Sequence, residues 1–185
     1  MHKQDIGVIK MEDRITLISL FNTGDIMKIE SCIGLNKKEL CKVPYIDGIC
    51  DRKLVDTLPY HFTFCAWDVE YEKFIIEKLR KIKFTSKEIL IDGVDIMENK
   101  NGSYILYLNA VVDEKIKSYQ ENIYNILPVE KYDPKRINFH ITIHVDKDYE
   151  KIKRIKEQIK FNPFSVKIEN VGLYRIYPAE LIEKY

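Results

Sequence analysis

The sequence has no excess of charge of either sign. Its 185 residues include 30 Lys and Arg and 29 Asp and Glu, which leaves a formal net charge of +1. A protein that coats nucleic acid carries a strong basic excess, so this balance argues against that class. It still allows a nucleotide or an RNA end to bind in a local basic cleft.

Long hydrophobic runs and paired cysteines are also missing. No apolar run approaches the roughly 18 residues of a membrane-spanning helix, and the first residues lack the apolar core of a signal peptide. The four cysteines form no CxxC pair, so we expect no structural zinc site. We therefore expect a cytoplasmic protein with reduced thiols, no membrane contact, and no metal or other cofactor.

Hydrophobic periodicity predicts strands that alternate with amphipathic helices. We expect strands at 14–21, 29–33, 61–67, 88–97, 103–112 and 137–145, and two more within 164–185. Apolar residues at helical spacing predict helices at 68–83, 113–127 and 148–160. The stretch 34–59 holds two prolines, two glycines and many charges, and we expect it to be a loop.

The sequence His-x-Thr occurs twice inside predicted strands, in HFTF at 61–64 and in HITI at 140–143. Side chains two residues apart on a strand lie on the same face. His61 and Thr63 therefore share a face, with the apolar residues between and after them turned toward a core. His140 and Thr142 repeat this arrangement.

The segments that follow the two motifs also match. Each motif is followed by a predicted helix, an Ile-Lys-Phe sequence and a strand with a glycine 32 residues after the histidine (93 − 61 and 172 − 140). We interpret this as a strand–helix–strand unit used twice, roughly at 58–108 and 137–185, in one two-lobed domain spanning 1–185. Two copies suit two lobes that face each other across a pseudo-two-fold axis.

Two imidazoles and two hydroxyls around one centre suit phosphodiester chemistry without a metal. A neutral imidazole can take a proton from water or a ribose hydroxyl, while a protonated imidazole gives one to the leaving oxygen. Threonine hydroxyls can donate hydrogen bonds to the phosphate oxygens, where charge develops. The sequence leaves open which histidine takes which role.

Paired His-x-Thr motifs 79 residues apart (140 − 61), in a duplicated chain of this length, resemble the two-histidine (2H) phosphoesterase superfamily. This group includes 2′-5′ RNA ligase-like proteins and cyclic nucleotide phosphodiesterases. The resemblance implies an α+β, bilobal, pseudo-two-fold fold, in which two antiparallel sheets face a central cleft and the helices lie outside. It also implies metal-independent catalysis, with His61, Thr63, His140 and Thr142 as the site residues. It does not choose among cyclic phosphates, 2′-5′ linkages and other RNA linkages as substrates.

Several further residues are candidates for substrate binding. Arg136, Arg175 and Arg52 are the cations that we expect nearest a phosphate. Trp67 could stack on a base, and Tyr177 could form part of the rim. Each has a plain structural alternative, as a solvated surface charge or as an aromatic residue of the core or rim.

Three other side chains receive weaker predictions. His144 is expected on the face of His140 as a peripheral substrate contact, since residues four apart on a strand lie roughly 13 Å apart and cannot share a metal ion. Cys65 is expected on the face of Thr63, where a nucleophilic role is conceivable but has no visible support. Tyr174 is a further rim candidate.

Three functions remain open on this evidence. The first is a phosphodiesterase that hydrolyses a cyclic phosphate or an RNA or oligonucleotide linkage. The second is a non-catalytic module that binds an RNA end or a nucleotide on the same fold. The third is a structural protein whose histidines are satisfied within the sheet. For the first two we expect a nucleotide or RNA-end partner, and we infer no obligatory protein partner.

Overall fold

Strands and helices alternate along the chain, and the computed structural model describes residues 14–34, 60–99, 102–127, 139–175 and 180–185. In order, the elements are β1 (Arg14–Leu20), α1 (Thr23–Ile33), β2 (His61–Asp68), the 3-10 helix η2 (Val69–Tyr71), α4 (Glu72–Leu79), β3 (Lys87–Glu98), β4 (Tyr104–Val111), α5 (Glu114–Ile126), β5 (His140–Asp146), α6 (Tyr149–Gln158), β6 (Phe164–Ile168), β7 (Asn170–Arg175) and β8 (Glu180–Lys184). None of these helices is long and apolar enough to cross a bilayer.

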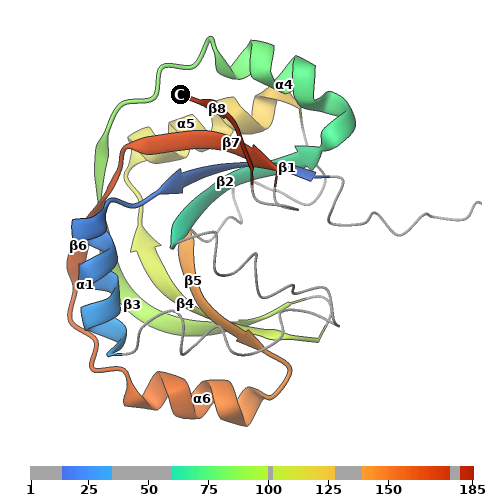
Figure 1. Ribbon diagram of the computed structural model, residues 1–185. Helices are drawn as coiled ribbons and strands as arrows, with labels where there is room; N and C mark the ends of the chain where they lie inside the picture. The colour runs from blue at the N-terminus through green and yellow to red at the C-terminus, as the bar shows by residue number, and fades with distance from the viewer. Residues whose placement is uncertain (1–13, 35–59, 100–101, 128–138, 176–179) are drawn as a thin grey trace, which may run out of the picture.

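The strands form two four-stranded antiparallel sheets. Sheet A has the order β2-β1-β7-β8, and sheet B has the order β5-β4-β3-β6. Helices α4 and α5 lie on the outer side of sheet A, and α6 lies on the outer side of sheet B (Figure 1). We call the opposite faces, which turn toward each other, the inner faces. The predicted α+β fold of two antiparallel sheets with helices outside is confirmed.

Each sheet contains strands from both halves of the chain. β3 follows β2 and α4 but pairs with β4 in sheet B, and β7 follows β5 and α6 but pairs with β1 in sheet A. The order β1-α1-β2-α4-β3 is therefore matched by β4-α5-β5-α6-β7, with β6 inserted before β7. The predicted repeat, with units roughly at 58–108 and 137–185, stays a prediction.

The predicted strand at 29–33 is wrong, because these residues end helix α1. The Asn22 side chain caps the helix by accepting the backbone N–H of Asp25 at 2.9 Å. Gly34 ends the helix with φ 67°, in the left-handed region that favours glycine. Ile29 and Ile33 lie on its buried side, so the helical spacing of these isoleucines was the better signal than their β-branching.

The C-terminal segment also differs from the prediction of two strands. It forms three strands, and the single residue Glu169 separates β6 in sheet B from β7 in sheet A. The chain thus passes directly from one sheet to the other. The predicted loop at 34–59 lies outside the described residues beyond Gly34.

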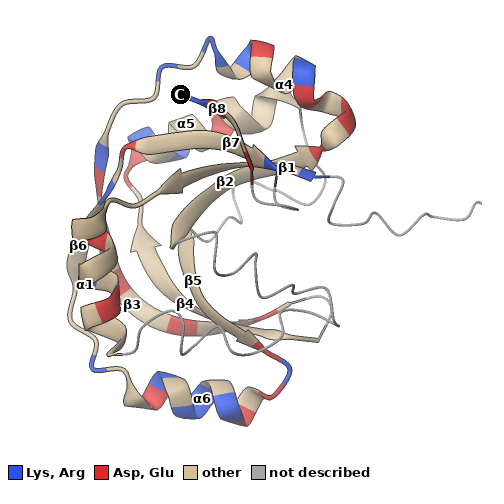
Figure 2. Ribbon diagram, in the orientation of Figure 1, with Lys and Arg blue, Asp and Glu red and all other residues tan. Residues whose placement is uncertain are grey.

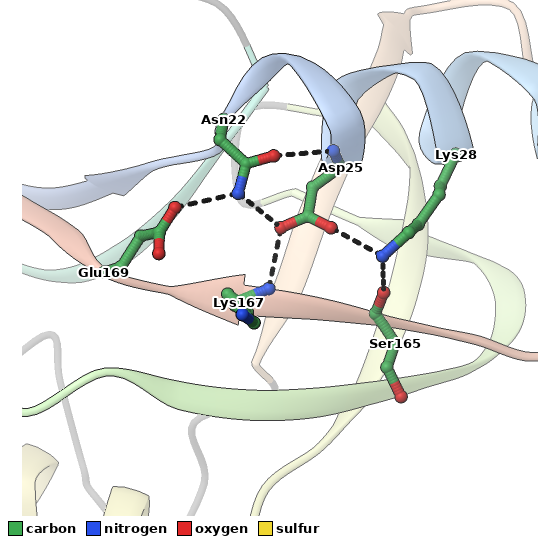
Figure 3. Close-up of polar contacts among 6 residues, drawn as sticks. All are labelled: Asn22, Asp25, Lys28, Ser165, Lys167 and Glu169. Carbon is green, nitrogen blue, oxygen red and sulfur yellow. Dashed lines mark hydrogen bonds and ion pairs between the residues drawn. The ribbon is translucent and has the colours of Figure 1, made fainter.

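Asp25 connects α1 to sheet B (Figure 3). Its buried carboxylate accepts the backbone N–H of Lys167 on β6 at 2.9 Å, Lys28 Nζ at 2.8 Å and Asn22 Nδ2 at 3.2 Å. Lys28 Nζ also donates to the Ser165 carbonyl on β6 at 2.9 Å. Because α1 follows a strand of sheet A, these bonds hold the two sheets together.

One hydrophobic core includes residues from both sheets. Within it, the rings of Phe62 and Phe139 lie 6.1 Å apart, and both side chains are at most 5% exposed. Phe62 directly follows His61, and Phe139 directly precedes His140. This contact therefore packs the starts of β2 and β5 against each other, which fixes where the two motifs lie.

Candidate active site

The two His-x-Thr motifs begin the two edge strands that meet at the junction of the sheets. β2 and β5 contact each other and begin side by side before they diverge (Figure 1). His61 is the first residue of β2, and His140 is the first residue of β5. The four motif residues are partly exposed, whereas Phe62 and Ile141 between them are fully buried. The predicted alternation of motif residues and core residues is confirmed at these positions.

A β-bulge follows the motif in β2. Thr63 pairs with Ile18 of β1, but Cys65 pairs with Leu17, which leaves Phe64 as an extra residue. The bulge reverses the alternation of side chains, so residues beyond it no longer share the face of the motif in the predicted way. The buried side chain of Gln120 on α5 donates to the carbonyl of the bulged Phe64 and so supports the bulge from the outer side.

A second bulge follows the motif in β5 at the corresponding place. Thr142 pairs with Tyr107 of β4, but His144 pairs with Leu106, which leaves Ile143 as the extra residue. Both motifs are therefore followed by the same irregularity. In each strand the β-bulge limits the polar pair on the inner face, which is the histidine and the threonine of the motif, to the first three residues.

These bulges overturn two of the predictions on the face of the first motif. The predicted base-stacking role of Trp67 is wrong, because its side chain is 2% exposed and its Nε1 donates to the Leu127 carbonyl just after α5, at 3.2 Å. Cys65 is fully buried, and burial raises the pKa of its thiol to about 12. A thiol with that pKa is no nucleophile near neutral pH.

The same reversal removes His144 from the inner face. Its side chain is 5% exposed, and its Nε2 lies 3.7 Å from the Asp146 carboxylate. Lys151 of α6 binds that carboxylate at 2.7 Å, so this cluster lies on the helix side of sheet B. The predicted substrate contact of His144 is therefore wrong.

Arg175 also lies on the outer side of its sheet. Its guanidinium forms a two-pronged pair with the Glu72 carboxylate at the start of α4, with N–O distances of 2.7 to 3.1 Å. The Glu180 carboxylate lies 3.6 Å from Nη1 of the same guanidinium. The predicted phosphate contact of Arg175 is therefore wrong, because α4 holds it on the face away from the histidines. Three other candidates lie outside the described residues: Arg136, Tyr177 and Arg52.

Two residues of β4 share the inner face with the second motif and were missed by the sequence analysis. The Tyr107 ring meets the His140 ring edge to face, with centroids 5.4 Å apart and an angle of 69°. Asn109 is the β4 partner of His140, and its Nδ2 donates to Asp92 Oδ1 at 2.6 Å. The alternation in β4 puts both side chains on one face, but only the sheet order shows that this face adjoins His140.

The inner face of sheet A is closely packed at Gly172. A Cβ there would lie 2.8 Å from Tyr174 Cε2 and 3.0 Å from Leu181 Cδ1, so a side chain at this position would require these neighbours to shift. Gly93, its predicted counterpart, meets nothing closer than 3.9 Å. The equal 32-residue steps to these glycines thus reflect no shared packing requirement. Tyr174 is partly exposed on this face, and burial raises its pKa.

Lysine and arginine are missing from the strands that form this site. β2, β4 and β5 contain neither residue, whereas α4 and α6 carry both signs of charge (Figure 2). On the inner face, the groups that these three strands offer to an anion are therefore imidazoles, the hydroxyls of the threonines and Tyr107, and the Asn109 amide.

Sequence comparison and structure comparison give different results for this chain. No protein-family model matches the sequence, and no curated protein matches it significantly. Among solved structures, E. coli LigT in its apo form matches with a TM-score of 0.57 at 11% identity, over 94% of this chain and 96% of that chain. Kluyveromyces marxianus Usb1 with uridine monophosphate matches with a TM-score of 0.50 at 12% identity, over 94% and 99%.

Both of these proteins are 2H phosphoesterases. The likeness extends over nearly the whole of each chain, although few residues are identical. The resemblance seen in the sequence is thus confirmed at the level of the fold, and the chain has the bilobal fold of the 2H phosphoesterase superfamily.

Proposed function

We propose that the protein is a phosphodiesterase that hydrolyses a cyclic phosphate or an RNA or oligonucleotide linkage without a metal ion. The observation that carries the proposal is the meeting of β2 and β5, which brings two partly exposed His-Thr pairs to one junction. The fold supports it, since the same architecture occurs in LigT and Usb1. Fold alone does not fix an activity, so the residues at the junction carry the proposal.

His61 and His140 act as a general acid–base pair in this proposal. The neutral imidazole takes a proton from the attacking water or ribose hydroxyl, and the protonated one gives a proton to the leaving oxygen. The P–O bond to the nucleophile forms as the P–O bond to the leaving group breaks. After turnover the two imidazoles have exchanged protonation states, and solvent resets them.

Thr63 and Thr142 hold the phosphate between the histidines. Each hydroxyl donates a hydrogen bond to a non-bridging oxygen, where negative charge grows in the transition state. A hydroxyl fixed on a strand needs little reorganisation to do this. With no lysine or arginine in β2, β4 or β5, these donors supply much of the stabilisation from those strands.

A nucleotide is the substrate class that we favour. The near-zero net charge of the chain and the uncharged strands of the site suit a small substrate. Usb1 was solved with uridine monophosphate, which shows that this fold can hold a nucleotide in that protein.

The experiment is a turnover assay in EDTA with 2′,3′-cyclic mononucleotides, a 1″,2″-cyclic phosphate, 2′-5′ oligoadenylate and cyclic oligonucleotides. We expect His61→Ala and His140→Ala each to lower turnover by about 10²- to 10⁴-fold. His144→Gln is the matched control, because this buried strand histidine lies beyond the bulge and should leave turnover intact if the protein folds.

Equal turnover by the parent and the His61→Ala/His140→Ala double variant would end the proposal. Saturable binding of a nucleotide with no product after long incubation would instead favour the binding module. In that case both single variants should lose affinity while the parent shows no turnover.

A further inference from the structure

The two histidines of the site have different neighbours. The Tyr107 ring packs against His140 at 5.4 Å, and the tyrosine is 6% exposed, so β4 and its surroundings hold it in place. In sheet A the corresponding partner of the motif is Ile18, which pairs with Thr63 as Tyr107 pairs with Thr142. His61 thus has an aliphatic residue where His140 has an aromatic ring.

We propose that Tyr107 is a positioning residue that fixes the orientation of the His140 imidazole. The proposal rests on the proposed function, in which His140 transfers a proton. An imidazole on a strand turns about two side-chain bonds, and an edge-to-face contact with a buried ring favours one orientation over the others. Proton transfer depends on that orientation, because a misplaced acid or base loses the aligned hydrogen bond to the reacting oxygen.

The support for the His140 ring within its sheet comes from β4. His140 lies on β5, an edge strand of sheet B, and among the described residues β4 is the strand that pairs with it. From β4, Tyr107 provides the ring contact and Asn109 provides the residue directly opposite His140. The Asn109 amide nitrogen donates to Asp92, whereas the Tyr107 ring lies directly against the imidazole.

The kinetic test compares Tyr107→Leu, Tyr107→Phe and the control Tyr104→Leu. Tyr104 lies on the same strand and meets Tyr149 edge to face at 5.1 Å, but its partner belongs to α6 on the outer side. We expect Tyr107→Leu to lower kcat by about 10- to 100-fold with KM within about twofold. Tyr107→Phe should restore kcat to near the parent value, and Tyr104→Leu should leave it unchanged.

Three results would overturn the positioning role. The first is an unchanged kcat in Tyr107→Leu. The second is an equal loss in Tyr107→Phe and Tyr107→Leu, which would assign the effect to the hydroxyl rather than to the ring contact. The third is an equal loss in Tyr104→Leu, which would make the effect a general loss of stability.

A second readout separates this inference from the proposed function. The imidazole signals of His140, assigned in NMR spectra with His140→Gln, report the orientation of the ring whether or not the protein turns over a substrate. We expect one sharp set of signals in the parent and in Tyr104→Leu, and broadened or doubled signals in Tyr107→Leu. Identical His140 signals in parent and Tyr107→Leu would refute the inference, while an inactive parent with the expected signals would refute only the proposed function.

Discussion

Thr63 and Thr142 each occupy the last inner-face position before a β-bulge. Each threonine follows a histidine by two residues and is partly exposed, and its β-branched side chain suits a strand. The shared face of each histidine and its threonine could be predicted from the two-residue alternation of a strand alone. The orientation of Trp67 could not be predicted in this way. The sequence HFTFCAW is apolar throughout after Thr63 and gives no sign of the β-bulge that turns the tryptophan toward α5.

Replacing the threonines tests the phosphate-binding role. Thr63→Val and Thr142→Val keep the shape and the strand propensity but remove the donor, so we expect each to lower kcat by about 10²-fold. Circular dichroism and thermal unfolding should show a folded protein in both cases. The measurement is steady-state turnover of the substrate found in the panel, with Thr85→Val, whose hydroxyl bonds to Tyr119 at 2.8 Å away from the site strands, as the control. A kcat unchanged in both motif variants would contradict the role.

The largely buried carboxylate of Asp146 makes the stability of the folded protein depend on pH in the acid range. Burial alone would raise its pKa, but the hydrogen bond from Lys151 and the backbone N–H of Asp148 outweigh burial and hold the pKa below its ordinary value. A lowered pKa means that the folded state binds fewer protons than the unfolded chain. This contribution to stability is therefore complete above about pH 4 and lost as the pH falls further.

Lys151→Met checks this dependence. We expect the variant to be less stable than the parent at pH 7 by about 1 kcal/mol, and the difference to be smaller at pH 3, where a larger fraction of Asp146 is protonated. Urea unfolding at the two pH values measures the free energy of unfolding. Lys153→Met, which changes an exposed lysine of the same helix, is the control. A Lys151→Met deficit of equal size at both pH values would show that the ion pair is not the cause.

At the level of elements, the site depends on how β2 and β5 pack together. Most strands and the helices α5 and α6 could be predicted from periodicity and capping, since Asp113 and Asp148 each cap the helix that follows them. The helix α1 was missed because its isoleucines resemble a short strand. Sheet order could not be predicted from the sequence, because β3 and β7 each pair with strands from the other half of the chain.

Phe139→Ala tests the packing at the junction of β2 and β5. The ring is 5% exposed and lies against Phe62, so its removal should lower the free energy of unfolding by about 3–5 kcal/mol. Phe74→Ala on α4 is the matched control, because that ring is 42% exposed and its loss should change stability by less than about 0.5 kcal/mol. Chemical denaturation measures both. Equal effects of the two variants would mean that the junction does not contribute in this way.

At the scale of the whole molecule, two of the connections between the sheets are made at β6. The chain passes between them at Glu169, and α1 binds β6 through Asp25 (Figure 3). The overall architecture could be predicted because the paired motifs resemble those of a known fold. The Asp25 connection could not, since its partners lie 142 residues apart in sequence.

Asp25→Ala removes that connection. It leaves the Lys167 N–H without its acceptor and removes one of the two hydrogen bonds that Asn22 Nδ2 donates, and we expect a loss of about 1–3 kcal/mol in the free energy of unfolding. Thermal unfolding and amide hydrogen exchange of β6 measure the loss and its location. Asp95→Ala is a control, because its pair with Lys156 is largely exposed and contributes little. Unchanged exchange in β6 would argue against the connection.

The most direct measurement is the pH dependence of kcat/KM in EDTA for the parent, His61→Gln and His140→Gln. Because one imidazole must be neutral and the other protonated, we expect a bell-shaped profile in the parent. Each single variant should lose about 10²- to 10⁴-fold of the activity and one limb of the bell. A bell that survives unchanged in either variant would contradict acid–base catalysis by the two histidines.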